Sequence, residues 1–294
     1  MLVEELIKQC EELLRESRFA AAALACDRAL EAKASKSARC RLLLLKAEAV
    51  VAEDGRWGGP VIACLREALD LAGDDMELKA RALVGCTAGY AALGSINHCR
   101  RHRDAYVQLM KSSPSAVLTK FYPRVEYNLA YANHEADRLD EAEDAYLLTR
   151  RACQQSEDPE TKARIPYIDH NLIDVFQEIG RHEEAKSLMD MSYPKLPENT
   201  FGAQIRNRRA IYALHAGDLD AAILWVESGL GHESCDTKTR AALTLTKAKV
   251  VLAHSQEVAA RDYATSAMRL AAAARSSRLC SRVLCFIKEL EEGV

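Results

Sequence analysis

Three asparagines stand at nearly the same distance before an alanine that follows a predicted turn. Asn128 and Asn171 each precede such an alanine by fourteen residues, and Asn207 precedes one by fifteen. An asparagine amide both donates and accepts hydrogen bonds, so it can bind the backbone of an extended peptide without selecting its side chains. The same amide can instead tether two neighbouring helices, and both roles remain open from the sequence.

Aromatic and charged residues share the predicted helix faces of these asparagines. One face carries Arg124, Tyr127, Tyr131, His134 and Glu135, and another carries Tyr167, His170, Asp174, Gln177 and Glu178. Aromatic side chains with polar tips suit interfaces because one end is apolar and the other stays hydrated. We therefore predict a partner-binding groove, with tyrosines that fill gaps between helices as the alternative. The candidate residues are Arg124, Tyr127, Asn128, Tyr131, His134, Tyr167, His170, Asn171, Asp174, Asn207 and Arg208.

A second cluster of chemically active side chains is the run His98-Cys99-Arg100-Arg101-His102-Arg103. Its two histidines lie one helical turn apart, a spacing with which imidazoles can hold a metal ion, and its arginines could receive phosphate. No HExxH glutamate accompanies them, so we favour a solvated basic face and predict no metal site. We interpret Arg275, Arg278 and Arg282 in the same way.

Motifs for catalysis are missing from the sequence. It contains no GxGxxG or GxxxxGK[ST] phosphate loop and no GxSxG nucleophile elbow. Ser192 and Lys195 match the SxxK pattern only by letter, because Pro194 interrupts the helix on which both would have to lie. We therefore predict a protein that is not an enzyme, with no catalytic residue and no cofactor.

The composition describes a folded chain without a general attraction for polyanions. Of the 294 residues, 49% are hydrophobic, which is enough to build a core, and the net charge is −3. We therefore do not expect direct nucleic-acid binding, and no apolar stretch approaches the ~20 residues that span a bilayer. The ten cysteines are scattered without a CxxC pair, so we predict reduced, buried thiols in a cytoplasmic protein.

The elements that position these residues repeat along the chain. A helix, a tight turn and an Ala-rich helix recur, and the residue just after the turn is Phe19, Trp57, Ile96, Leu139, His182, Leu219 or Glu257. This spacing of 37 to 43 residues is typical of repeat arrays, and the few prolines stand almost entirely between helical segments. Glycine at three of the turns (Gly94, Gly180, Gly217) suits the left-handed backbone that ends many helices. The pattern predicts an all-α chain of helix hairpins.

We expect a single domain, 1–294, because each repeat of such an array packs only on its neighbours. Its hairpins span residues 3–34, 38–72, 76–111, 117–155, 160–193, 200–230 and 238–275, followed by a capping helix, 278–292. In the fourth hairpin the first helix is expected to run from Val125 to Ala136. Leu139, Ala142, Ala145, Tyr146 and Thr149 recur at three and four residues, which places them on one face of the second helix.

These repeats resemble the tetratricopeptide-repeat (TPR) family. The resemblance rests on Asn128-Leu129-Ala130 with Arg138-Leu139-Asp140-Glu141-Ala142, on Gly180-Arg181-His182-Glu183-Glu184-Ala185, and on Gly217-Asp218-Leu219-Asp220-Ala221-Ala222. It implies a right-handed superhelical solenoid of about seven antiparallel hairpins, whose first helices line a concave groove for a peptide or a partner helix. Repeats longer than the standard ~34 residues are most like those of regulatory TPR regions in bacterial signalling proteins.

The resemblance also suggests where a ligand binds. The third hairpin presents a bland face with Arg81, Val84 and Ala88, so the expected ligand centres on the fourth to sixth hairpins. The mixed charges there leave the charge of the ligand undefined. No lysine stands among the groove neighbours of Asn128 and Asn171, so the clamp of chaperone-binding TPR proteins is not reproduced.

Two functions fit this reading. The first is a scaffold or adaptor that binds a peptide-like segment or helix of another protein. The second is a ligand- or peptide-sensing regulatory module that controls a partner such as a transcription regulator. The first 35 residues form a predicted repeat hairpin, and no output domain is encoded, which favours the adaptor.

Overall fold

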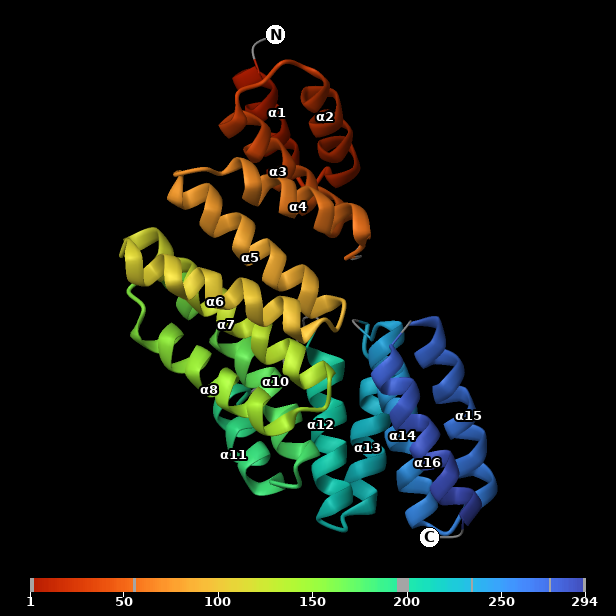
Figure 1. Cartoon of the computed structure of the whole chain (residues 1–294). Coiled ribbons are helices and arrows are strands. Elements are labelled where there is room, and N and C mark those ends of the chain that lie inside the picture. The colour runs from red at the N-terminus through yellow and green to blue at the C-terminus, as the bar shows by residue number, and fades with distance from the viewer. Residues whose placement is uncertain (1–2, 55–56, 195–200, 234, 275, 293–294) are drawn as a thin grey trace. The chain divides into compact units, whose positions relative to one another are not determined.

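The chain folds into a series of α-helices joined by short turns (Figure 1). The computed structural model describes residues 3–54, 57–194, 201–233, 235–274 and 276–292, and all regular secondary structure among them is helical. Two compact units can be distinguished, unit 1 (Met1–Ile168) and unit 2 (Asp169–Val294). Across the described ranges, no helix is both long and apolar enough to cross a membrane.

Each unit is a stack of helix pairs. Unit 1 contains α1 (Val3–Arg15), α2 (Phe19–Glu31), α3 (Lys36–Asp54), α4 (Gly59–Leu71), α5 (Met76–Ala92), α6 (Ile96–Ser112), α7 (Ala116–Glu135), α8 (Leu139–Gln155) and the short α9 (Pro159–Lys162). Helix α10 (Ile165–Glu178) contains the division between the units. Unit 2 continues with α11 (His182–Ser192), α12 (Gly202–His215), α13 (Leu219–Leu230), α14 (Thr237–Ala253), α15 (Glu257–Ala273) and α16 (Ser277–Glu292). Alternate helices also pack on each other, α5 on α3 and α7 in unit 1 and α12 on α14 in unit 2.

The hairpin turns share one backbone geometry. With the exception of Trp57, the post-turn residues of the predicted repeat are the first residues of α2, α6, α8, α11, α13 and α15. Two positions before each stands a residue with a positive φ angle: Ser17 (59°), Gly94 (68°), Asp137 (56°), Gly180 (81°), Gly217 (77°) and Ser255 (61°). The predicted left-handed glycines are thus confirmed, and the same conformation also occurs at a serine or an aspartate.

Hydrogen bonds identify this turn as a Schellman motif. Before α13, the Asp218 N–H donates to the Ala213 carbonyl at 2.9 Å, and the Gly217 N–H donates to the Leu214 carbonyl at 3.1 Å. The equivalent pair of bonds occurs at the other five turns. Because these bonds satisfy carbonyls that a helix end leaves unpaired, the chain can reverse direction tightly.

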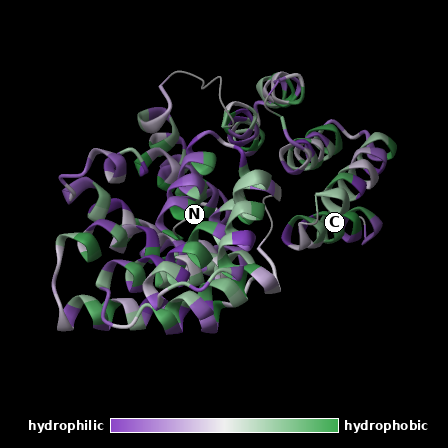
Figure 2. Ribbon diagram, turned by 90° about the horizontal axis from the view of Figure 1, so that it is seen from above, coloured by the Kyte–Doolittle hydropathy of each residue, from purple (hydrophilic) through white to green (hydrophobic). Residues whose placement is uncertain are grey.

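Three positions after the first residue of each of these second helices stands a small buried residue. Ala22, Cys99, Ala142, Ala185, Ala222 and Ala260 are fully buried. Their small side chains let the second helix of a hairpin approach its neighbours closely. The predicted face of α8 is confirmed, since Ala145, Tyr146 and Thr149 are buried as well. Figure 2 shows the resulting alternation of hydrophobic and hydrophilic residues along individual helices.

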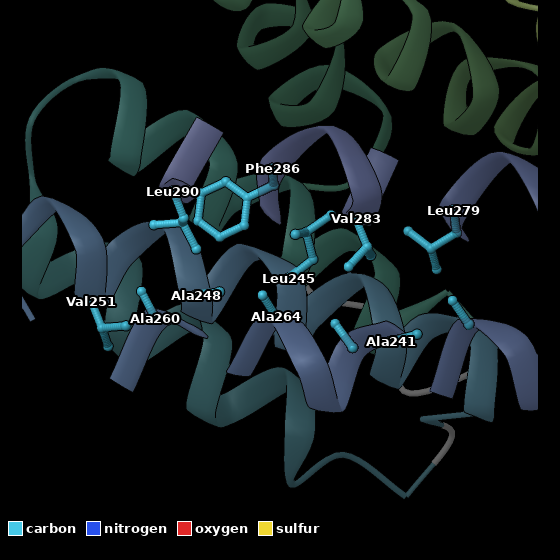
Figure 3. Close-up of a cluster of buried hydrophobic side chains, with 12 residues drawn as sticks. Ala241, Leu245, Ala248, Val251, Ala260, Ala264, Leu279, Val283, Phe286 and Leu290 are labelled. Atoms are coloured by element: carbon cyan, nitrogen blue, oxygen red, sulfur yellow. The ribbon is translucent and has the colours of Figure 1, made fainter. Parts of the chain in front are cut away.

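Unit 2 ends in a hydrophobic cluster that α16 covers (Figure 3). Leu279, Val283, Phe286 and Leu290 recur at three- and four-residue intervals, which places them on one face of α16. They pack against buried residues of α14 and α15, including Leu245, Ala248, Ala260 and Ala264. The narrow alanine side chains leave room for the larger groups of α16.

Most cysteines serve as small core residues, as predicted. Seven of the ten are buried, and none of the ten, all within the described ranges, is in a disulfide. Burial raises the pKa of the Cys86 and Cys99 thiols to about 12. Such thiols stay protonated and are poor nucleophiles.

Helix α7 corrects two expectations. It begins at Ala116 instead of Val125, and Pro123 lies inside it instead of between helical segments. The helix starts early because the Ser115 hydroxyl accepts a hydrogen bond from the Leu118 N–H. Leu118 and Val125, before and after the proline, are fully buried. The burial of this apolar face outweighs the hydrogen bond that proline removes.

Candidate partner-binding site

Unit 1 contains a groove whose walls are mainly the first helices of its hairpins. One cavity, of about 620 Å³, is lined by residues of α3, α5, α7 and α9, together with Trp57 and Arg164. A second cavity, of about 330 Å³, lies between α7, α8 and the start of α10. Arg124, Glu160 and Arg164 line both cavities. We therefore treat the two as one site, the unit 1 groove.

The floor of the groove is the face of α5 that looks bland in the sequence. Val84, Gly85 and Ala88 line the larger cavity. Their small side chains are the reason why a hollow exists, because larger groups at these positions would fill it. At Gly85 an added Cβ would come within 2.5 Å of Leu65 of α4, which lines the same cavity, so the glycine makes room for this leucine. This face carries few reactive side chains, so its sequence gives no sign of the hollow.

Three arginines from successive segments face this space. Arg81 lies on α5, Arg124 on α7 and Arg164 just after α9, and all three line the larger cavity. None of them forms an ion pair with a carboxylate of the described residues. Burial lowers the pKa of Arg124, and the charges of Arg164 and Arg81 lower it further while Glu48 opposes them. Arg124 is nevertheless exposed to solvent, as expected for a side chain in an open hollow.

The carboxylates of the groove are distributed unevenly. Asp158 and Glu160 share the Lys120 ammonium group, at 3.6 and 3.2 Å. Glu48 and Glu77 line the larger cavity from α3 and α5. The point where the two cavities meet is therefore bordered by Arg124 and Arg164, with its carboxylate, Glu160, already paired.

Two predicted tyrosines line the smaller cavity. Tyr127 comes from α7 and Tyr167 from the start of α10, and Tyr167 is 55% exposed. Pro123 lines the same cavity. Arg124, Tyr127 and Tyr167 are thus the predicted site residues that the structure brings together around one hollow.

Asn128 contacts the neighbouring hairpin. Its amide donates to the Thr87 hydroxyl at 2.9 Å and to the Val84 carbonyl at 3.4 Å, so it joins α7 to α5. In unit 2, Asn207 accepts a hydrogen bond of 2.8 Å from the Thr246 hydroxyl, which joins α12 to α14. These bonds are the tethering role considered above. Asn171 is half-buried on α10.

His134 lies inside the fold of unit 1. It is 4% exposed, and its ring meets the ring of buried Tyr146 edge-on, with centroids 6.0 Å apart. Tyr127 meets the same ring at 5.8 Å, while Tyr131 is half-buried further along α7. The aromatic residues of α7 therefore divide between the groove and the α7–α8 contact.

In unit 2, three predicted site residues form a buried polar network. The Arg208 guanidinium donates to Asp174 and to Nε2 of His170, the latter at 2.9 Å. Since arginine only donates, Nε2 must be the acceptor and the imidazole proton lies on Nδ1. Burial and the charge of Arg208 lower the pKa of His170 to about 3. Gln177 adds a bond of 2.8 Å to the Arg208 carbonyl, so the network ties α10 to α12.

The basic run of α6 is not simply a solvated face. Cys99 is fully buried, and Arg103 pairs with Glu126, which is 1% exposed, at 2.7 Å. His98 and His102 stack on Tyr90, with centroids 4.8 and 5.2 Å apart from its ring. The run therefore packs α6 against α5 and α7, and no group of three potential metal ligands gathers in the described part of the chain.

The interpretation of the C-terminal arginines as solvated is wrong for Arg278. Its side chain is only 11% exposed and pairs with Glu178 of α10, which also accepts from Arg282 at 3.0 Å. Folding of unit 2 brings residues one hundred positions apart into contact, which no local pattern reveals. Arg275 lies outside the described residues.

Sequence reasoning underrated Arg81 and missed Arg164 as groove residues. A signal for Arg81 exists, because Arg81 and Arg124 each stand fifteen positions before a post-turn residue, Ile96 or Leu139. Equivalent positions in successive hairpins face the same side of a stack. Arg164 follows the short helix α9, which interrupts the repeat, so the same comparison does not find it.

Comparison with solved structures defines the fold as the TPR-type helical solenoid. The apo quorum sensor NprR from B. thuringiensis is similar with a TM-score of 0.63 and 11% identity, over 98% of this chain and 87% of that one. The Rap conjugation gene regulator of plasmid pLS20, in complex with the Phr* peptide, has a TM-score of 0.51 and 13% identity, over 99% and 96%. Aspartyl phosphate phosphatase F from Bacillus subtilis has a TM-score of 0.53 and 11% identity, over 98% and 94%.

No protein-family model matches the sequence, and no curated protein matches it. The likeness is therefore one of fold. At 11 to 13% identity it does not carry the activities of these proteins over to this chain.

Proposed function

We propose that this chain is a non-enzymatic interaction module that binds a peptide-like segment or helix of a partner protein. The observation that carries the proposal is the unit 1 groove, an open hollow bordered by exposed Arg124 and Tyr167. A hollow of this kind, formed by rigid helices, can hold a partner segment without a large change of its own. The Rap conjugation gene regulator, which has a similar fold, was solved in complex with a peptide, and this supports a peptide-like ligand.

The predicted site residues divide into those that contact the partner and those that hold the helices. Arg124, Tyr127 and Tyr167 contact the bound segment directly. Tyr131 of α7 and Asn171 of α10 are further candidates. Asn128, Asn207, His134, His170, Asp174 and Arg208 hold the first helices in place, since they are buried or bonded to neighbouring helices.

The chemistry of the cysteines supports a role without catalysis. Burial raises the pKa values of the Cys86 and Cys99 thiols in unit 1, so they stay protonated and are poor nucleophiles. Free thiols throughout the described ranges also fit a reducing compartment, so we place the protein in the cytoplasm.

The groove is tested with peptides selected from a random dodecamer library on the immobilised full chain. Calorimetry then compares the wild type with Tyr127→Ala and Tyr167→Ala, and with Tyr263→Ala in unit 2 as the matched control. We expect either groove variant to weaken binding about tenfold and the control to change it less than about twofold. Equal affinity for all variants with an intact helical spectrum would show that the peptides bind elsewhere.

A regulatory sensor is the second candidate, and the solved quorum sensor and gene regulator of similar fold favour it. Small-angle scattering with and without a saturating selected peptide separates the two functions. An adaptor keeps its scattering profile, whereas a sensor that transmits binding as a conformational change shows compaction.

A further inference from the structure

The two cavities of the unit 1 groove share three lining residues, Arg124, Arg164 and Glu160. Arg81 lines the larger cavity, and the charges of Arg81 and Arg164 act on Arg124. All three side chains lack a carboxylate partner among the described residues. Two arginines with deeply buried partners or side chains show the contrast, because Arg103 pairs with Glu126 and Arg208 pairs with Asp174.

This arrangement is electrostatically unfavourable for the empty protein. The neighbouring charges of Arg164 and Arg81 and the groove walls all disfavour the charged form of Arg124. Glu48 compensates in part, from the far side on α3, and Glu160 is engaged by Lys120. Unpaired like charges in a partly enclosed space are stabilised when an anion enters, because the surrounding protein screens them less than water does.

The planar shape of the guanidinium groups restricts which kind of anion they bind well. A guanidinium is planar and offers parallel N–H donors, which match the two oxygens of a carboxylate. Arg124 also lies over the ring of Phe121, 6.0 Å from its centroid, which limits its orientations. Tyr127 and Tyr167 line the smaller cavity together with Arg124 and Arg164, and their rings can cover the aliphatic part of a bound side chain.

Resting on the proposed function, we infer that the unit 1 groove binds an acidic segment of its partner, with a glutamate or aspartate carboxylate held between Arg124 and Arg164 and a second one near Arg81. The clustering of unpaired guanidinium groups on successive segments of one groove carries this inference.

The inference is tested on the full chain with three probes: fluorescein-labelled hexaglutamate, its hexaglutamine counterpart and inorganic phosphate. Anisotropy should show binding of hexaglutamate that weakens between 50 and 300 mM salt. Arg164→Gln should weaken it about tenfold. Arg101→Gln, an exposed arginine of α6 outside the groove, should change it less than about twofold.

Four outcomes would overturn the inference. Hexaglutamine could bind as tightly as hexaglutamate, which would show that the carboxylates do not contribute to binding. Arg101→Gln could weaken binding as much as Arg164→Gln, which would indicate a non-specific charge effect. Inorganic phosphate could bind more tightly than hexaglutamate, which would indicate a site for a free anion. Peptides selected from the random library could depend on Tyr127 but lack acidic residues and ignore Arg164→Gln. The last outcome would leave the unit 1 groove intact as the peptide site, whereas loss of the tyrosine dependence would show that peptides bind elsewhere on the chain.

Discussion

Polar side chains on the first helices either hold the fold together or remain available to a ligand, and the residue type alone does not tell which. Arg208 is 3% exposed and holds His170 and Asp174 in unit 2, whereas Arg124 and Arg164 of unit 1 are open to solvent in a groove. A buried guanidinium needs partners, because an unpaired charge in the interior is costly. The presence or absence of such partners therefore distinguishes a structural arginine from one available to a ligand.

His170 should make the stability of unit 2 depend on pH. An unfolded histidine takes up a proton near pH 6.5, whereas burial and the charge of Arg208 lower the pKa of folded His170 to about 3. Between these values the unfolded state binds more protons, so the free energy of unfolding falls as the pH falls. We expect a loss of about 2 kcal/mol between pH 7.5 and pH 5, measured by urea denaturation.

The control for this prediction is a pair of histidine variants. His170→Gln should remove most of the pH-dependent loss, while His254→Gln, at an exposed turn, should leave it in place. The same pH dependence in the wild type and in His170→Gln would contradict the assignment.

Among the structural elements, the repeated turn reverses the chain between the two helices of each hairpin. The residue two positions before α6, α11 and α13 is a glycine, and the same place before α15 is Ser255 with a φ angle of 61°. A left-handed conformation is free of strain at glycine and costs about 1 kcal/mol at other residues. The hairpin therefore forms even where the turn residue is unfavourable, because the packed faces of both helices stabilise it.

Exchanging residues at these turns should change stability in opposite directions. Gly217→Ala should lower the free energy of unfolding by about 1 kcal/mol, although no atom lies within 4 Å of the added Cβ, because the cost is in the backbone. Ser255→Gly should raise it by about 0.5–1 kcal/mol. Thermal denaturation measures both, and Gly59→Ala, which has equal space and no positive φ, is the neutral control. An equal loss for Gly59→Ala and Gly217→Ala would argue against a backbone origin.

Some of these elements could be predicted from the local sequence pattern. The starts of the second helices and their buried small residues follow from the repeat, because turn chemistry and packing recur within a few residues. The start of α7 does not, because a proline normally argues for a helix end and only tertiary burial of Leu118 and Val125 overrides it.

At the scale of the whole molecule, contacts between distant residues complete each compact unit. In unit 2, Glu178 at the end of α10 accepts from Arg278 and Arg282 of α16, the last helix. These groups are largely buried, with side-chain exposures of 17% for Glu178 and 11% for Arg278. The pair therefore joins the two ends of unit 2 in addition to the hydrophobic cluster under α16.

Removing this carboxylate should loosen unit 2 selectively. Glu178→Gln removes the negative charge beside the largely buried Arg278, so we expect a loss of about 1–3 kcal/mol in the free energy of unfolding. Hydrogen exchange should increase in α16 and in the end of α10, with little change in α1 to α6. Glu183→Gln, an exposed acidic position in α11, is the control. Uniform exchange changes across both units would contradict a local role.

The helix hairpins, their turns and the class of fold follow from the amino-acid sequence, because they depend on interactions between residues a few positions apart that recur along the chain. The sequence also marked Arg124, Tyr127 and Tyr167 as candidates for ligand contact. The three-dimensional packing was needed to show which polar residues are bonded inside the fold, as Arg208 and Arg278 are, and where a hollow remains. The floor of the unit 1 groove consists of Val84, Gly85 and Ala88. A cavity is defined by volume that side chains from several helices leave empty, and no single segment of sequence records it.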